Sequence, residues 1–424
     1  MAFSQDLRRG VHLTVVPSQK FKTVSAAVNF IAPLELNTLT ERQLIANLWP
    51  VANAQYPDPR QLTMALQDLY GASLRTGVDR EGALSIVSAQ LQFLSDRTLP
   101  AGESLLPQAL ALLQSIVWQP LLQQGDYAPS FFKPERDNLD HELRSVMDSA
   151  DNAAVLTAQK QYFQHAPEQA ALLAGTPATI AAANAAQLAA YWTHMQDTDQ
   201  IEIVITGDVD PQQAAAIVNA WSIAPRPIVP TPIQWTGKLP HLRQWQVAAP
   251  FQQSQLIMMY HLPVTYYGPK YFDYMVTDAL FGGSASSLLF AAVREQASLA
   301  YYAGTDLDAQ TGTTLLQAGI DPGTADQVRA IVAQTLEQLQ TGDFTDVRLH
   351  SIQEELIGMR LGEADRQSDV NSRALLQRRL PDADMTTTTF TQGIQNVTRE
   401  QVAACAKQYQ LVVDFLQEGA SHDD

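Results

Sequence analysis

One short stretch of the chain has the spacing of a catalytic zinc site but not its residue types. Gln43, Ala46 and Asn47 fall at positions i, i+3 and i+4 of a predicted helix over residues 40–50. One class of zinc hydrolases carries histidine, glutamate and histidine there, because positions i and i+4 project from one helix face and can share a Zn²⁺. The carboxylate at i+3 then activates the metal-bound water. Two amides and a methyl group cannot perform this chemistry, so we expect neither a metal nor a cofactor on this helix.

The other catalytic and metal-binding patterns in the chain are incomplete. His141 and Glu142 open the sequence His-Glu-x-x-His, but Ser145 stands in place of the second histidine. No histidine occurs between His12 and His141, so a shifted alignment does not complete the first motif either. A single cysteine, Cys405, cannot build a thiolate cluster and is predicted to be a small core residue. Composition leaves Ser-His-Asp catalysis open, although no G-x-S-x-G turn is present.

Composition and charge exclude several other classes of function. The chain has 424 residues and a formal net charge of −17, which disfavours general binding to nucleic-acid phosphates. Its apolar runs are too short for the roughly 20 residues of a membrane span, and its first residues do not resemble a secretory signal. We therefore expect a soluble, cytoplasmic protein with no membrane span and no nucleic-acid partner.

The helix that carries residues 43–47 follows an alternating, strand-like stretch over residues 23–34. Thr38 and Glu41 have the spacing of a capping box at its start. Leu44 and Leu48 lie on the face predicted to pack inward, opposite the three degenerate positions. This order predicts a strand leading directly into a helix that covers a sheet.

The same order of elements occurs twice in the chain. A strand, a helix and two further strands over residues 26–93 are matched by residues 254–321, with an offset of 225 for the Ala-Ser-Leu at 72–74 and 297–299. Strand pairs that alternate with helical layers indicate the α+β class. We predict two homologous α/β sandwich halves, each a mixed or antiparallel sheet covered by helices: residues 1–221 and 240–424, joined by a proline-rich linker over residues 222–239.

At this point the chain resembles the pitrilysin/insulinase-type peptidases, which include the mitochondrial processing peptidases. The most specific stretch is LFGGSASSLLFAAVREQASLAYY at residues 280–302, which is similar to the family's glycine-rich turn and R-E-x-x-x-L-A-Y signature. The strand ending IVITGDVD at residues 203–210 is a second match. The resemblance implies two homologous α/β halves that close like a clamshell around an unfolded peptide.

The resemblance also assigns roles to single positions. Gln43 and Asn47 replace the two zinc-binding histidines of active members, Ala46 replaces the catalytic glutamate, and Glu142 is the counterpart of the third ligand. One carboxylate without the imidazole pair is not a catalytic zinc site. The resemblance therefore implies an inactive peptidase homologue.

Four residues of the second half are candidates for peptide binding by the same resemblance. Arg294 and Tyr301 match an arginine and a tyrosine that contact the peptide backbone in active relatives, and Gly282 and Gly283 match a segment that touches incoming peptide. The alternatives are an ion pair for Arg294, core packing for Tyr301 and a serine-capped turn for the glycines.

We therefore predict a non-catalytic, auxiliary peptide-binding subunit that pairs with an active, zinc-bearing homologue, similar to a silent bacterial branch of the family linked to elongation factor P modification. Two alternatives stay open. The chain is a stand-alone peptide-binding or scaffold protein, such as a homodimer, or it is a zinc endopeptidase with relocated ligands that include Glu142.

Overall fold

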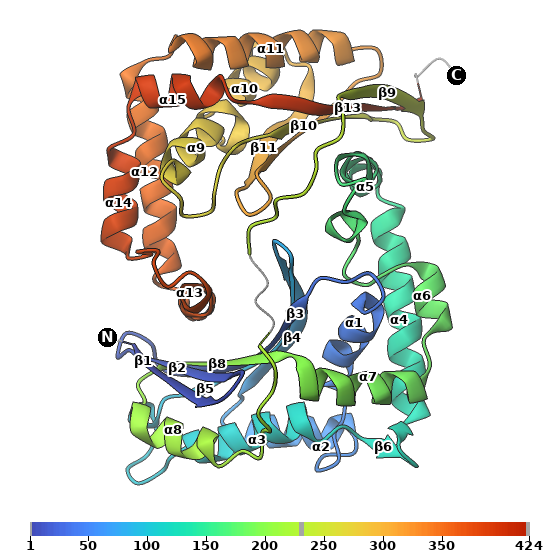
Figure 1. Cartoon of the computed structure of the whole chain (residues 1–424), viewed down its shortest axis with the longest axis vertical. Coiled ribbons are helices and arrows are strands. Elements are labelled where there is room, and N and C mark those ends of the chain that lie inside the picture. The colour runs from blue at the N-terminus through green and yellow to red at the C-terminus, as the bar shows by residue number, and fades with distance from the viewer. Residues whose placement is uncertain (1, 229–232, 421–424) are drawn as a thin grey trace. The chain divides into compact units, whose positions relative to one another are not determined.

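The computed structural model describes residues 2–228 and 233–420, and within these it leaves the side chains of residues 295 and 296 undescribed (Figure 1). The chain forms two compact units. The first comprises residues 1–144, 172–233 and 363–381, and the second comprises residues 145–171, 234–362 and 382–424. Part of the predicted linker, residues 229–232, lies outside the described residues.

The first unit is built on a six-stranded mixed sheet with the strand order β1-β2-β8-β3-β5-β4. All neighbours in this sheet are antiparallel except β2 and β8, which are parallel. Its strands are β1 (Phe3–Arg8), β2 (Val11–Pro17), β3 (Thr23–Pro33), β4 (Ser73–Glu81), β5 (Leu84–Leu94) and β8 (Gln200–Gly207).

Helices cover the apolar face of this sheet. Val28, Ala89 and Ile203 lie side by side on three central strands and are fully buried with the helices in one core. The helices are α1 (Leu39–Leu48), α2 (Pro59–Asp68), α3 (Leu106–Trp118), α4 (Pro129–Met147), α6 (Pro177–Ala182), α7 (Ala185–Thr198) and α8 (Pro211–Asn219), with a small hairpin of β6 (Leu122–Gln123) and β7 (Asp126–Tyr127).

The second unit is built on a five-stranded sheet with the order β11-β12-β10-β13-β9. Its strands are β9 (Arg243–Ala248), β10 (Ser254–His261), β11 (Ala300–Asp308), β12 (Thr313–Ile320) and β13 (Gln410–Glu418). Its larger helices are α9 (Tyr271–Asp278), α11 (Ala325–Thr341), α12 (Asp346–Glu363), α14 (Thr387–Gln395) and α15 (Arg399–Ala406), and the short α10 (Leu288–Phe290) follows a π-helical turn, η3 (Ala279–Gly283).

The two sheets share one strand order. Read from β9, the second sheet repeats the order β2-β8-β3-β5-β4 of the first, and in both cases only the first pair, β2 with β8 or β9 with β13, is parallel. The α+β class and the two sheet-containing halves are confirmed. The matched order is what an internal duplication requires, and the duplication itself and the boundary at residues 222–239 stay predictions.

Each unit takes one helix from the other half of the sequence. Helix α5 (Ala150–Tyr162) packs on β10 and β13 of the second unit, and helix α13 (Gln367–Arg379) packs on β8 and β3 of the first. Gln367 anchors α13, because its amide donates to the backbone oxygens of Thr23 and Thr206, both at 2.8 Å. The second face of each sheet is therefore covered by a segment distant in sequence, which local sequence patterns do not reveal.

The stretch Tyr271–Arg294 is the one among the described residues with the length and hydropathy of a membrane span. Its chain leaves the helical conformation at Ser284, which is extended (φ −129°, ψ 152°). Val276, Leu280 and Leu289 are fully buried in the core of the second unit. This stretch is therefore a core segment of a folded unit.

Candidate functional site

Helix α1 carries the degenerate zinc positions, and the structure shows what occupies them. The side-chain amide of Gln43 donates to Oδ1 of Asn47 at 2.9 Å, so the two residues at the histidine positions bond to each other one helical turn apart. Ala46, at the position of the catalytic glutamate, is fully buried and belongs to the apolar core. These positions therefore carry neither an imidazole pair nor a carboxylate, and one hydrogen bond joins the two amides.

The predicted capping box at the start of α1 is wrong. No side chain caps the first turn, and the hydroxyl of Thr38 instead donates to the backbone oxygen of Glu35 at 3.0 Å. Thr38 has φ −117° and ψ −9°, outside the extended conformation in which a threonine side chain reaches the N3 amide. The spacing of Thr38 and Glu41 suits a capping box, but the backbone conformation of Thr38 does not.

Arg42 holds α1 in place, and sequence reasoning missed it. Its guanidinium is completely buried and pairs with Asp199 at 2.6 Å. It also donates to the backbone oxygens of Phe30 and Ser85 at 2.9 and 3.1 Å. In the sequence, an arginine between polar residues of an amphipathic helix looks like a surface residue. Its partners come from β3, β5 and the end of α7, so the local sequence gives no sign of its burial.

Glu142, the predicted counterpart of the third zinc ligand, lies exposed on α4. Burial, together with repulsion from the Glu142 charge, raises the pKa of Glu135 on the same helix. Across residues 2–228 and 233–420, no three histidine, cysteine, aspartate or glutamate side chains gather as a metal-binding group. The geometry therefore offers no alternative ligand set around Glu142.

The structure brings Arg294 and Tyr301 together in the second unit. The guanidinium carbon of Arg294 lies 6.0 Å from the ring centroid of Tyr301 and 5.0 Å from that of Phe290. Arg294 is exposed, and Tyr301 is 82% exposed at the start of edge strand β11. The exposure of Tyr301 contradicts the alternative of core packing. No ion pair of Arg294 occurs among the side chains that the structure describes, which leave out residues 295 and 296, and peptide contact by the two residues stays a prediction.

Gly282 and Gly283 have a structural reason to be glycine. A Cβ atom at Gly282 would lie 2.7 Å from Cγ2 of Thr305 on β11, and one at Gly283 would lie 2.8 Å from the Asp278 carboxylate. The turn after them is capped by Ser287, whose hydroxyl accepts from the Phe290 amide at 3.2 Å. The predicted serine-capped turn is present, and peptide contact by the glycines stays a prediction.

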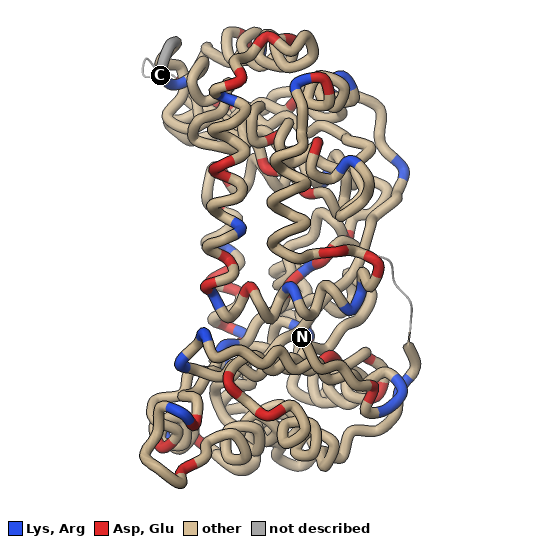
Figure 2. Tube along the Cα trace, turned by 90° about the vertical axis from the view of Figure 1, so that its left-hand side faces the viewer, with Lys and Arg blue, Asp and Glu red and all other residues tan. Residues whose placement is uncertain are grey.

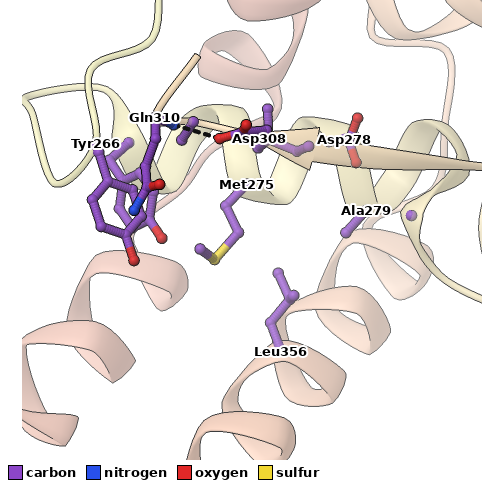
Figure 3. Close-up of a pocket in the computed structure, with 11 residues that line it drawn as sticks. Tyr266, Met275, Asp278, Ala279, Asp308, Gln310 and Leu356 are labelled. Atoms are coloured by element: carbon purple, nitrogen blue, oxygen red, sulfur yellow. Dashed lines mark hydrogen bonds between the residues drawn. The ribbon is translucent and has the colours of Figure 1, made fainter. Parts of the chain in front are cut away.

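A buried carboxylate lies behind this turn. Asp278 at the end of α9 accepts hydrogen bonds from Thr314 and Thr305 at 3.0 and 3.1 Å. It is one of the residues that line a cavity of about 340 Å³, together with Tyr266, Asp308 and others (Figure 3). Burial raises the pKa of Asp278 to about 7, because no cation is near to offset the loss of hydration.

Three residues on the hairpin of β1 and β2 have the hydrogen-bond order of a serine hydrolase. The Ser4 hydroxyl lies 2.8 Å from Nε2 of His12, and Nδ1 of His12 lies 2.7 Å from Asp6. A catalytic carboxylate of this kind is buried, whereas the Asp6 side chain is 73% exposed and is shared with Arg378 of α13 at 3.1 Å. We interpret the trio as part of the attachment of α13 to the sheet edge.

Comparisons with known proteins agree with this geometry. A family model described as "Peptidase M16 inactive domain" matches residues 182–356. The "Probable inactive metalloprotease YmfF" of Bacillus subtilis is 24% identical over 418 residues, which cover 97% of this chain and 96% of that protein.

Two solved structures show the fold over the full length. A conserved protein from Enterococcus faecalis V583 is 28% identical with a TM-score of 0.95, and the match covers 100% of both chains. A peptidase M16 inactive domain from Pseudomonas fluorescens is 16% identical with a TM-score of 0.79, and the match covers 99% of this chain and 98% of that one.

The Arg42–Asp199 pair predicts a large loss of stability when it is broken. Arg42→Met leaves the buried Asp199 charge and two backbone oxygens without partners, so we expect the free energy of unfolding to fall by about 3–5 kcal/mol in urea denaturation. The exposed control Arg144→Ala, which loses a surface pair with Asp140, should change it little. Adding Asp199→Asn to Arg42→Met should restore part of the loss; equal stability of wild type and Arg42→Met would contradict this account.

Because the zinc-binding positions carry no metal ligands, we predict that the chain does not bind zinc. A specific site filled at a hundredfold excess over its Kd would add about 2.7 kcal/mol and raise the Tm by several degrees. We expect neither added Zn²⁺ nor a chelator to shift the Tm in differential scanning fluorimetry. A zinc-dependent rise that disappears in Glu142→Ala would show that Glu142 belongs to a relocated site.

Asp278 predicts a pH dependence of stability. Its folded pKa of about 7 lies above the ordinary value of 3.8, so between these values the folded chain holds a proton that the unfolded chain releases. Its contribution to stability is therefore present below about pH 4 and is lost as the pH rises to about 7. Asp278→Asn should gain stability relative to wild type across this range, by up to about 4 kcal/mol. The control Asp343→Asn, at an exposed position, should show no such trend; a constant difference for Asp278→Asn would refute the assignment.

Proposed function

We propose that this chain, which is a catalytically inactive homologue of the pitrilysin-type M16 peptidases, acts as an auxiliary peptide-binding subunit of an active, zinc-bearing homologue. The observation that carries the proposal is a contrast between its two units. In the first, the catalytic positions Gln43, Ala46 and Asn47 are closed by a mutual hydrogen bond and by core packing. In the second, Arg294 and Tyr301 remain side by side and exposed.

The exposed pair has properties that suit a peptide ligand. The hydroxyl of Tyr301 and the guanidinium of Arg294 are hydrogen-bond donors, and a peptide backbone offers a carbonyl acceptor at every residue. An aromatic ring that is 82% exposed is unfavourable in water, and burial against a peptide would recover that free energy. Such donors would hold a peptide without cleaving it, because the chain has no zinc motif to activate water.

Free sheet edges supply a second means of holding an extended chain. Strand β4 ends the sheet of the first unit and β11 ends that of the second. An edge strand has unpaired backbone N–H and C=O groups, and an extended peptide can join it as an additional strand. In this proposal the partner supplies zinc, its ligands and the general base, and the present chain supplies binding surface.

A stand-alone peptide-binding or scaffold protein, such as a homodimer, is the main alternative, and it differs in needing no zinc-bearing partner. A metallopeptidase with relocated ligands would need a ligand set around Glu142, and no such group exists among the described residues. A cytoplasmic location and a link to elongation factor P modification remain predictions from the resemblance.

Stimulation of a partner tests the proposed function. We expect this chain to cleave no peptide alone and to raise the cleavage rate of its zinc-bearing homologue on an unfolded peptide. Arg294→Ala and Tyr301→Ala should each reduce this stimulation by about tenfold, through lost donors, while leaving the Tm unchanged. Val347→Ala is the matched control, because Val347 is an apolar residue that is 80% exposed elsewhere in the second unit. A chain that leaves the partner's rate unchanged at every ratio would refute the auxiliary role.

A further inference from the structure

The second faces of the two sheets both bury apolar side chains, and that of the first sheet also carries a polar region. In the second unit, α5 covers the apolar side chains of Ile257, Met259 and Phe415 and seals them in a core. In the first unit, α13 covers a mixed face. Ile86 and Val204 pack with Leu375 of α13 in an apolar cluster. Beside them, Asn29, Ser88 and Glu202 lie side by side on three neighbouring strands. Burying polar groups is unfavourable unless they find partners, so this face requires an explanation.

A cavity of about 340 Å³ lies on this face. Its lining includes Asn29, Ser88 and Gln90 from the central strands, Asp79 from edge strand β4, and Asn371 and Ser372 from α13. It therefore extends from the inside of the sheet to the edge at which a peptide strand can add. The cavity is large enough for a long side chain with accompanying water.

The amides around the cavity are oriented by bonds that use their NH₂ groups. Asn29 donates to the Glu202 backbone oxygen at 2.9 Å. Gln90 and Asn371 both donate to the hydroxyl of Ser25, at 2.7 and 2.8 Å. Asn371 is only 6% exposed, and its Oδ1 accepts no hydrogen bond within the described part of the chain. A buried oxygen without a donor is costly, so Oδ1 of Asn371 is an acceptor that a ligand with N–H groups could satisfy.

Asp79, which is solvent-exposed on edge strand β4, adds a negative charge to the lining of the cavity. No ion pair or hydrogen bond of its carboxylate occurs among the described residues, and a partial loss of hydration raises its pKa. Glu81, which also lines the cavity, is already paired with Arg379 of α13. Arg80 lines the cavity as well, but strand alternation directs its Cβ to the opposite face, and it is engaged in an interaction of its own. Within the described part of the chain, the charge of Asp79 therefore has no counter-ion.

Gly77 leaves room beside this charge. It is paired with Ser88 in the sheet and shares a face with Asp79, and a Cβ atom placed on it would meet no atom within 4 Å. Its φ is not in the left-handed region, so a larger residue there is conformationally ordinary. The space beside Gly77 is therefore not needed for packing of the sheet.

From these observations we propose that the cavity is a specificity pocket for a basic side chain, arginine or lysine, of an extended peptide that adds to strand β4. This inference rests on the proposed peptide-binding function and names the substrate class. The peptide backbone pairs with the edge of β4, and one inward side chain passes over Gly77 into the cavity. Its guanidinium or ammonium donates to the carboxylate of Asp79 and to the amide oxygens of the wall.

The charge of the whole chain favours such a ligand. Acidic residues number 44 against 27 basic ones, and both kinds are spread along the described part of the trace (Figure 2). A net charge of −17 attracts a cationic peptide at long range and increases its association rate. Binding should therefore weaken as salt is added.

The experiment compares three peptides by fluorescence anisotropy with the full chain. Each is a fluorescein-labelled peptide of alternating threonine and serine, with one central residue that is arginine, its neutral isostere citrulline, or glutamate. We expect the arginine peptide to bind at least about tenfold more tightly than the citrulline peptide, and the glutamate peptide most weakly. Asp79→Asn should remove the difference between arginine and citrulline while the citrulline peptide binds as before.

Two further variants complete the test. Gly77→Val fills the gap with a β-branched residue suited to a strand, so the Tm should not fall while the arginine peptide loses affinity by about tenfold or more. Asp68→Asn is the matched control, because it removes one exposed carboxylate from the same unit, and it should leave all three affinities unchanged. Equal binding of the three peptides, unaffected by Asp79→Asn, would overturn the pocket and leave peptide binding intact. No binding of any peptide would overturn both the pocket and edge pairing at β4, whereas stimulation of a partner tests the proposed function separately.

Discussion

The guanidinium of Arg42 ties helix α1 to three other parts of the first unit. It bonds to backbone oxygens of β3 and β5 and to the carboxylate that ends α7. A fully buried charge is tolerated only with a complete set of partners. The network therefore fixes the rotational orientation of helix α1 about its own axis. That orientation determines the direction in which positions 43, 46 and 47 project. The zinc motif is therefore missing because the residue types at these positions differ, and not because the helix is displaced.

The degenerate catalytic positions and the surfaces that we propose to bind peptide belong to different elements. The catalytic positions lie on α1, whereas the exposed donors lie at the start of β11 and the cavity lies between β4, β5 and α13. The covering helices add a further difference, since α5 seals an apolar face and α13 covers a face with both apolar and polar side chains. The two units thus share one strand order and differ in the side chains on their second faces.

Much of the fold followed from local patterns. The alternating strand over residues 23–34, the helix after it and the repeated order of elements are recorded in short-range periodicity, and the sheets confirm them. Gln43, Ala46 and Asn47 could likewise be located through their spacing. The cap at Thr38 failed because spacing does not specify φ and ψ.

The features that could not be predicted all depend on contacts between distant segments. Arg42 and Asp199 are 157 residues apart, and Asn371 meets Ser25 across 346 residues. Nothing in the neighbourhood of Asp278 or Asp79 indicates that the one is fully buried and the other has no counter-ion within the described part of the chain. The burial and pairing of such residues are set only when distant segments of the chain pack together.

The central claim is that this chain and a zinc-bearing homologue form one functional unit. Sedimentation of an equimolar mixture, with metal analysis of the resulting species, tests it most directly. The account predicts a single heteromeric species that contains one zinc ion per pair, with all of the zinc carried by the homologue. Two separately sedimenting proteins, or zinc bound by this chain alone, would contradict it.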